Sequence, residues 1–136
     1  MLTIKAFYKD KKGLYCNPGG NKFYYEVGKT YTCETEKVSI CEYGFHASAN
    51  CDISETIIFY YISYNIRYYL VDLNVIESYE DLAVGDKITI LKKLSFDECI
   101  KYDKTGEWCY LFALFINGVD VNKLQDAIIE KDDSGE

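Results

Sequence analysis

The chain has 136 residues, a length typical of one domain, and a formal net charge of −7 at pH 7. Hydrophobic residues make up 49% and charged residues 27% of the sequence, which is ordinary for a globular protein and excludes a disordered chain. No apolar run reaches the length that a bilayer requires, so we expect no membrane-spanning helix, and we expect no secretory signal.

Charge is unevenly distributed along the sequence. Residues 1–41 carry seven lysines and four acidic residues, whereas residues 42–136 carry eight basic and eighteen acidic residues. Arg67 is the only arginine. Proteins that read DNA sequence use a dense basic face and arginines that contact base edges, so we expect no specific DNA binding.

Six cysteines are spread over the chain, at positions 16, 33, 41, 51, 99 and 109. Their even number is compatible with disulfides, but a chain of this length folds without such cross-links. Several of these cysteines also have apolar neighbours, where a free thiol behaves as a small hydrophobic group. We therefore expect reduced thiols and a cytoplasmic location in a bacterial cell.

The N-terminal part of the sequence is typical of β-structure. Apolar and polar residues alternate over residues 2–8, which predicts a half-buried strand, and the turn-rich segment 10–21 contains the only proline. Short aromatic and β-branched runs follow at residues 22–27, 29–33 and 38–41, which predicts a meander of short antiparallel strands.

The next segments combine helix and strand signals. Asp52 and Glu55 have the spacing of a capping box, which predicts a short helix over residues 53–61, although the aromatic and β-branched content keeps a strand as the alternative. Residues 66–76 give the clearest strand pattern, with Tyr69, Val71, Leu73 and Val75 on one face. Residues 87–92 are predicted to form the neighbouring strand, after a turn at Gly85 and Asp86.

The C-terminal part is helical in pattern. A capping box of Ser95 and Glu98 predicts a helix to about residue 102, followed by helices over about 107–117 and 122–131. The last helix is expected to turn Leu124, Ala127 and Ile128 inward. The fold class is therefore α+β: a β-rich body of short, mostly antiparallel strands at 1–94, followed by a tail at 95–136. The tail is expected to end in a helical hairpin and to pack on the body as one compact unit.

The sequence of residues 103–107, DKTGE, recurs as DDSGE at 132–136. The offset of 29 residues is the size of one helical-repeat module, which predicts a single or truncated helical repeat in the tail.

Three segments carry a resemblance to a known family: YYEVGKT at 24–30, CEYGFHA at 41–47 and KITILKKLS at 87–95. They resemble an uncharacterised domain family that is common in bacteriophages, prophages and low-GC bacteria. Its members share Y-x-x-G-K-x-Y and C-E-x-G-F-H-A segments. In related proteins helical repeats with a core similar to WCYLFA, here residues 108–113, follow the domain. The resemblance implies a phage or prophage origin and no established activity.

His46, the only histidine, lies in the segment GFHAS and is a candidate general base or ligand-binding residue. Ser48 shares its face if the segment is a strand. The structural alternative is a hydrogen-bonded histidine at a strand end. A zinc site of Cys33, Cys41, His46 and Cys51 is a weaker possibility, because the spacing is irregular. No other metal or cofactor motif is present, so we expect no cofactor.

Pairs of adjacent aromatic residues recur in the predicted strands. Because neighbouring strand residues face opposite sides, each pair places one ring on an exposed or half-exposed face, where it could bind a ligand or a protein. The alternative is ordinary strand packing in which the tyrosine hydroxyls reach water. The candidate binding residues are Tyr24, Tyr25, Phe45, His46, Tyr68 and Tyr69.

The sequence favours a non-enzymatic protein-interaction module of phage or prophage origin. Its partner is expected to be another protein or a second copy, bound through the C-terminal helices. The alternative is a small enzyme of nucleotide-transferring type, similar to ADP-ribosyltransferases, that uses residues 44–48. A cleft that joins His46 to a carboxylate with a strongly perturbed pKa would favour the enzyme, and a flat aromatic face would favour the module.

Overall fold

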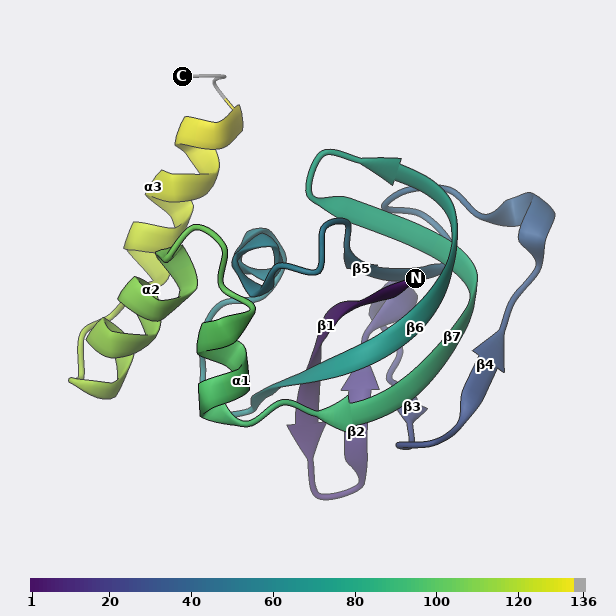
Figure 1. The fold of residues 1–136 in the computed structure, drawn as a ribbon, viewed down its shortest axis with the longest axis horizontal. Helices are drawn as coiled ribbons and strands as arrows, with labels where there is room; N and C mark the ends of the chain where they lie inside the picture. Colours follow the sequence, from purple (N-terminus) through teal and green to yellow (C-terminus); the bar gives the residue numbers. More distant parts are fainter. Residues whose placement is uncertain (134–136) are drawn as a thin grey trace.

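A computed structural model describes residues 1–133 as a strongly curved antiparallel sheet with helices on one side (Figure 1). The strands are β1 (Leu2–Asp10), β2 (Gly13–Cys16), β3 (Phe23–Tyr25), β4 (Thr30–Thr32), β5 (Phe45–Ser48), β6 (Ile66–Tyr79) and β7 (Leu82–Lys93). The helices are α1 (Phe96–Lys101), α2 (Glu107–Ile116) and α3 (Asn122–Asp133), with short 3-10 turns η1 (Pro18–Gly20), η2 (Thr35–Lys37) and η3 (Ile53–Ile58). The predicted α+β class is confirmed.

The long hairpin of β6 and β7 gives the sheet its curvature (Figure 1). Its register shifts at three places, between residues 70 and 71, 74 and 75, and 75 and 77, and such bulges bend and twist a strand. Gly85 lies beside these irregularities, where a Cβ would come within 2.1 Å of the Asn74 carbonyl oxygen. The predicted turn at Gly85 and Asp86 is therefore wrong: both residues lie inside β7, and the glycine permits a close backbone approach.

Strand order in the sheet is β3-β2-β1-β6-β7-β4, and β5 also pairs with β7. The predicted meander holds for β1 to β3. It is wrong beyond them, because β4 pairs with β7 at the other end of the sheet. The run at 38–41 forms no strand and takes part only in an isolated bridge between Ser39 and Tyr43.

Curvature brings β5 close to β1, although their backbones are not paired. Side chains of β1 span the gap instead: Thr3 Oγ1 donates to the Ser48 carbonyl oxygen, and Lys5 Nζ donates to that of His46. The interior of the curl is filled by an inner cluster of buried residues: Phe7, Leu14, Tyr25, Phe45, Ala47, Tyr69, Val71, Leu73, Ala83, Ile88 and Ile90.

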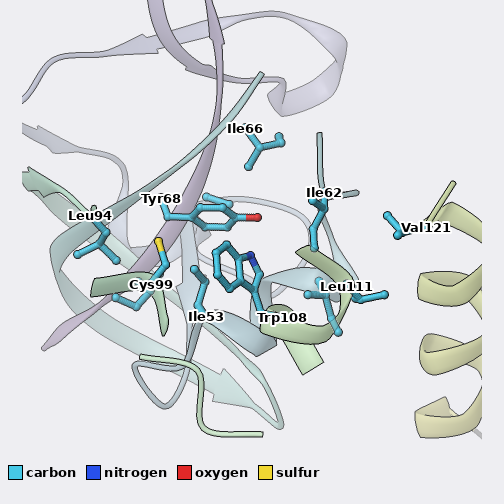
Figure 2. Close-up of a cluster of buried hydrophobic side chains, with 12 residues drawn as sticks. Ile53, Ile62, Ile66, Tyr68, Leu94, Cys99, Trp108, Leu111 and Val121 are labelled. Atoms are coloured by element: carbon cyan, nitrogen blue, oxygen red, sulfur yellow. The ribbon is translucent and has the colours of Figure 1, made fainter. Parts of the chain in front are cut away.

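A second core lies between the sheet and the helices (Figure 2). The indole of Trp108, 1% exposed, packs edge-on against Tyr68 with 5.6 Å between ring centroids. This helix-side cluster comprises Ile4, Ala6, Ile53, Ile57, Ile62, Ile66, Tyr68, Leu94, Cys99, Trp108, Leu111 and Val121. Because both faces of the sheet are covered, residues 3–7 of β1 are buried on both sides, and the prediction of a half-buried strand is wrong.

The helix starts follow their sequence signals. Asp52 caps η3 by accepting from Ser54 N at 3.0 Å, so the helical interpretation of this segment is right and the strand alternative is wrong. The predicted capping box is incomplete, because the Glu55 carboxylate binds Ser48 and Asn50, and the helix ends at Ile58. Both hydrogen bonds of the Ser95–Glu98 capping box are present at α1. Asp103 accepts from Gly106 N and Cys109 N, so the first copy of the repeated pentamer forms the turn into α2.

Helix α3 is attached through residues other than those predicted. Leu124 and Ala127 are exposed, and of the predicted stripe only Ile128 is partly buried. The inward residues are Val121 and Gln125. The second copy of the pentamer ends in residues 134–136, which lie outside the described residues. None of the helices within residues 1–133 is long and apolar enough to cross a membrane.

Candidate functional site

The curl of the sheet leaves an open cleft of about 990 Å³. Its walls are β1, β5, the end of η3 with residues 59 and 60, and the loops at 16–19 and 32–34 and at 41–44. This volume lies at the upper end of the range for small-molecule sites. The aromatic face is therefore concave, and the flat face that would favour a protein-interaction module is not found here.

Aromatic rings form much of the cleft wall. Tyr8 and Tyr60 are in contact, with ring centroids 5.1 Å apart, and Phe23 packs against Tyr25 at 4.9 Å. Burial raises the pKa values of Tyr25 and Tyr60, so both hydroxyls stay protonated. Phe59 completes this side and is 47% exposed. The wall therefore presents neutral rings with hydroxyl groups.

His46, on the β5 wall, is held by the backbone at both ring nitrogens. Nε2 accepts from Cys41 N at 2.8 Å, so Nδ1 carries the proton and donates to the Gly44 carbonyl oxygen at 3.1 Å. Burial, and then the positive charge of Lys5, lower the pKa of His46, opposed by the bond to Gly44. The histidine is therefore neutral and fixes the loop before β5.

Ser48 and Glu55 form a buried polar cluster at the far end of β5. The Ser48 hydroxyl donates to Glu55 and accepts from Asp52 N at 2.9 Å. Asn50 donates twice to the same carboxylate, from its backbone at 2.8 Å and from its side chain at 2.7 Å. Glu55 thus ties the end of β5 to η3 with three donors.

Lys5 is the basic residue among those that line the cleft. It is 6% exposed, its ammonium donates to the His46 carbonyl oxygen, and it lies 5.4 Å from the centroid of the Phe7 ring.

The structure brings together only part of the predicted binding set. Tyr25, Phe45, His46 and Ser48 line the cleft. Tyr24 lies outside it and donates to Asp10 at 2.6 Å.

Tyr68 and Tyr69 are also away from the cleft, and both are 8% exposed. The expectation that one ring of this pair would be exposed is wrong. The helix-side cluster covers Tyr68, and the inner cluster covers Tyr69.

The four residues of the possible zinc site are not brought together. Cys33, Cys41 and His46 lie around the cleft, but Cys51 follows β5 at its other end and does not line it. Within the described part of the chain, no three histidine, cysteine or acidic residues are grouped so that they could hold a metal ion. All six cysteines are unpaired.

A family model described as a domain of unknown function, DUF7666, matches residues 1–102. The chain belongs to the DUF7666 family. Comparisons with curated proteins and with solved structures gave no match. The DUF7666 match runs from β1 to the end of α1 and so includes every residue that lines the cleft, whereas α2 and α3 lie beyond it.

Several cleft residues of this DUF7666 domain escaped the sequence analysis, namely Lys5, Tyr8, Cys16, Glu55, Phe59 and Tyr60. They come from β1, β2, η3 and the two residues after η3, and only the curl of the sheet brings these segments together. One signal was available: Lys5 lies between Thr3 and Phe7 on the strand face opposite Ile4 and Ala6. A lysine within an otherwise buried strand is an unusual choice.

Proposed function

We propose that this DUF7666 protein is a non-enzymatic binding module whose ligand occupies the cleft. The observation that carries the proposal is the large concave site lined by aromatic rings, in which the candidate catalytic groups already have partners. A general base or nucleophile needs a free lone pair near the substrate. Both nitrogens of His46 and the hydroxyl of Ser48 are engaged in holding β5 in place.

The chemistry of the wall favours a ligand with a flat ring. Tyr8, Tyr25, Tyr60 and Phe59 offer ring faces and edges, and ring pairs contribute about 0.5–1.5 kcal/mol beyond their buried area. Tyrosine hydroxyls at the ends of these rings would orient polar groups of the ligand.

Benzamide, a neutral aromatic probe, tests this proposal. Titration followed by amide NMR should shift signals of residues that line the cleft and leave those of α3 unchanged. Phe59→Ala should weaken binding, because Phe59 lines the cleft and its exposure makes the substitution compatible with folding. Tyr64→Ala is the matched control, since Tyr64 is 77% exposed and lies outside the cleft. Shifts spread over the whole surface, or equal affinity in both variants, would contradict the proposal.

One observation favours the alternative of a nucleotide-transferring enzyme. Glu55 places a carboxylate beside Ser48 in the cleft, and this is the group that the sequence could not assign. Incubation with NAD and detection of released nicotinamide would reveal such an activity. Release that is lost in Glu55→Gln, with the variant still folded, would favour the enzyme over the binding module.

The C-terminal helices carry a second proposed surface, for a protein partner or a second copy of the chain. Ile116 of α2, Leu124 of α3 and Val119 in the loop between them are exposed, which supports the proposal. Sedimentation equilibrium should show self-association that Ile116→Ser weakens; a monomer at all concentrations would leave only a heterologous partner. We also propose a phage or prophage origin, a single or truncated helical repeat in the tail, and a cytoplasmic location. The unpaired cysteines support the cytoplasmic location, because the cytoplasm keeps thiols reduced.

A further inference from the structure

We propose that Lys5 is an anion-binding residue in the floor of the cleft, so that the ligand combines a flat ring with an anionic group such as a carboxylate. This inference rests on the proposed binding function and specifies the chemistry of its ligand.

Among the residues that the structure describes, Lys5 is a buried cation without a counter-ion. Its side chain is 6% exposed, yet the ion pairs among the described residues involve other groups, and no carboxylate there lies within ion-pair distance of its nitrogen. Lysines are almost never this buried unless paired, because removing an ammonium from water is costly. An anionic ligand would supply the missing partner.

The bridge to β5 does not explain why this residue is charged. Thr3, two residues earlier on the same face, makes the equivalent bridge to the Ser48 carbonyl oxygen with a neutral hydroxyl. The Lys5 ammonium has three donors, of which the His46 carbonyl oxygen takes one. The ammonium also lies 5.4 Å from the centroid of the Phe7 ring, which accepts no conventional hydrogen bond.

Two acidic residues of the cleft, Glu55 and Glu34, already have other partners. The Glu55 carboxylate accepts hydrogen bonds from Ser48 and Asn50. Glu34 is paired with Lys37 at 2.9 Å on the exposed side. The effect of the charge on its surroundings is visible at His46, whose pKa is lowered by burial and by Lys5.

Three probes separate the charge from the ring: benzoate carries both, benzamide only the ring and acetate only the charge. We expect benzoate to raise the melting temperature of the full chain more than either other probe at equal millimolar concentration, because a ligand that binds only the folded state stabilises it. Lys5→Met should abolish the difference between benzoate and benzamide. Thr3→Val, which removes the other bridge to β5 without changing charge, should preserve it.

A second measurement does not depend on Lys5→Met being stable. His46 is the only histidine, so its ring signals can be followed in the unmodified protein. An anion at Lys5 would offset the positive charge that lowers the pKa of His46, so benzoate should raise this pKa and benzamide should not.

Equal binding of benzoate and benzamide, with no response of the His46 pKa, would overturn the anion site while leaving the cleft as a binding site. Absence of binding by all three probes would overturn both proposals. A benzoate preference that survives Lys5→Met would also overturn the role of Lys5.

Discussion

At Gly85, the two longest strands come so close that a side chain has no room. The ideal Cβ position lies 2.1 Å from the Asn74 carbonyl oxygen and 2.9 Å from Leu73. Gly85→Ala should therefore destabilise the protein by about 1–3 kcal/mol or more, measured by urea unfolding, because backbone must move to admit the methyl group. Gly28→Ala is the comparison variant. Gly28 has open space around it, so its substitution costs only the backbone strain of a non-glycine residue at a φ of +86°, about 1–2 kcal/mol. An unchanged urea midpoint for Gly85→Ala would contradict the close approach of Gly85 to the Asn74 carbonyl oxygen.

His46 should make stability depend on pH just below neutrality. Burial lowers its pKa in the folded state from the ordinary 6.5, so the unfolded chain binds more protons in the window below 6.5. Stability is therefore fully present above pH 6.5 and decreases as the pH falls through this window. Urea midpoints between pH 8 and about 5.5 should fall in the parent and change less in His46→Gln. A His46 pKa at or above 6.5, measured by NMR, would contradict the buried neutral ring.

The side chain of Gln125 attaches helix α3 to the segment that contains the end of η3 and the residues after it. Its side-chain amide is completely buried, donates to the carbonyl oxygens of Ile57 and Tyr60 at 3.0 and 3.1 Å, and accepts from Ile62 N at 2.9 Å. Gln125→Leu keeps the volume but leaves three backbone groups without partners, so we expect a loss of about 1–3 kcal/mol.

Hydrogen exchange measures this loss where it occurs. The amides of α3 should exchange faster in Gln125→Leu, whereas the exposed control Lys123→Ala should leave them unchanged. Protection that persists in Gln125→Leu would show that Val121 and its neighbours hold α3 without the amide.

The elements differ in how far the sequence could predict them. Local signals sufficed for α1, where Ser95 and Glu98 complete a capping box, and for β6, where the buried face alternates as expected. For α3 they predicted the helix but not its inward residues, because hydrophobic spacing cannot reveal that a glutamine is the buried residue. They failed also at Gly85, where a glycine that resembles a turn signal allows close approach to Asn74 in the neighbouring strand β6.

The cleft belongs to the whole molecule and was the least predictable feature. Phe45, His46 and Ser48 were found because they are adjacent in one motif. Lys5 and Tyr60 were not, since their proximity to β5 depends on the curvature of the sheet and on the bulges that create it. Long-range geometry of this kind leaves no periodic trace in the sequence.

Thiol chemistry provides a test over the whole chain. Unfolded without reductant, the protein should consume six equivalents of a thiol reagent, because its six cysteines are unpaired. In the folded protein Cys41, which is exposed, should react first. Cys99 should react last, since burial raises its pKa to about 12 and leaves almost no thiolate at pH 8. Four equivalents or fewer in the unfolded protein would indicate native disulfides and remove the support for a reducing compartment.

The loop of residues 33–44 connects β4 to β5, and both of these strands pair with β7 at nearby positions. β4 ends with Thr32 opposite Lys87, and β5 begins with Phe45 opposite Gly85, so β7 closes the loop at its base. Doubling the length of such a segment costs only about 0.6 kcal/mol in closure entropy. Since Glu34, Cys41 and Tyr43 of this loop line the cleft, insertions and substitutions here can accumulate without altering a strand pairing. Changes in the length or sequence of this loop should therefore alter the lining of the cleft while β4 and β5 stay paired with β7.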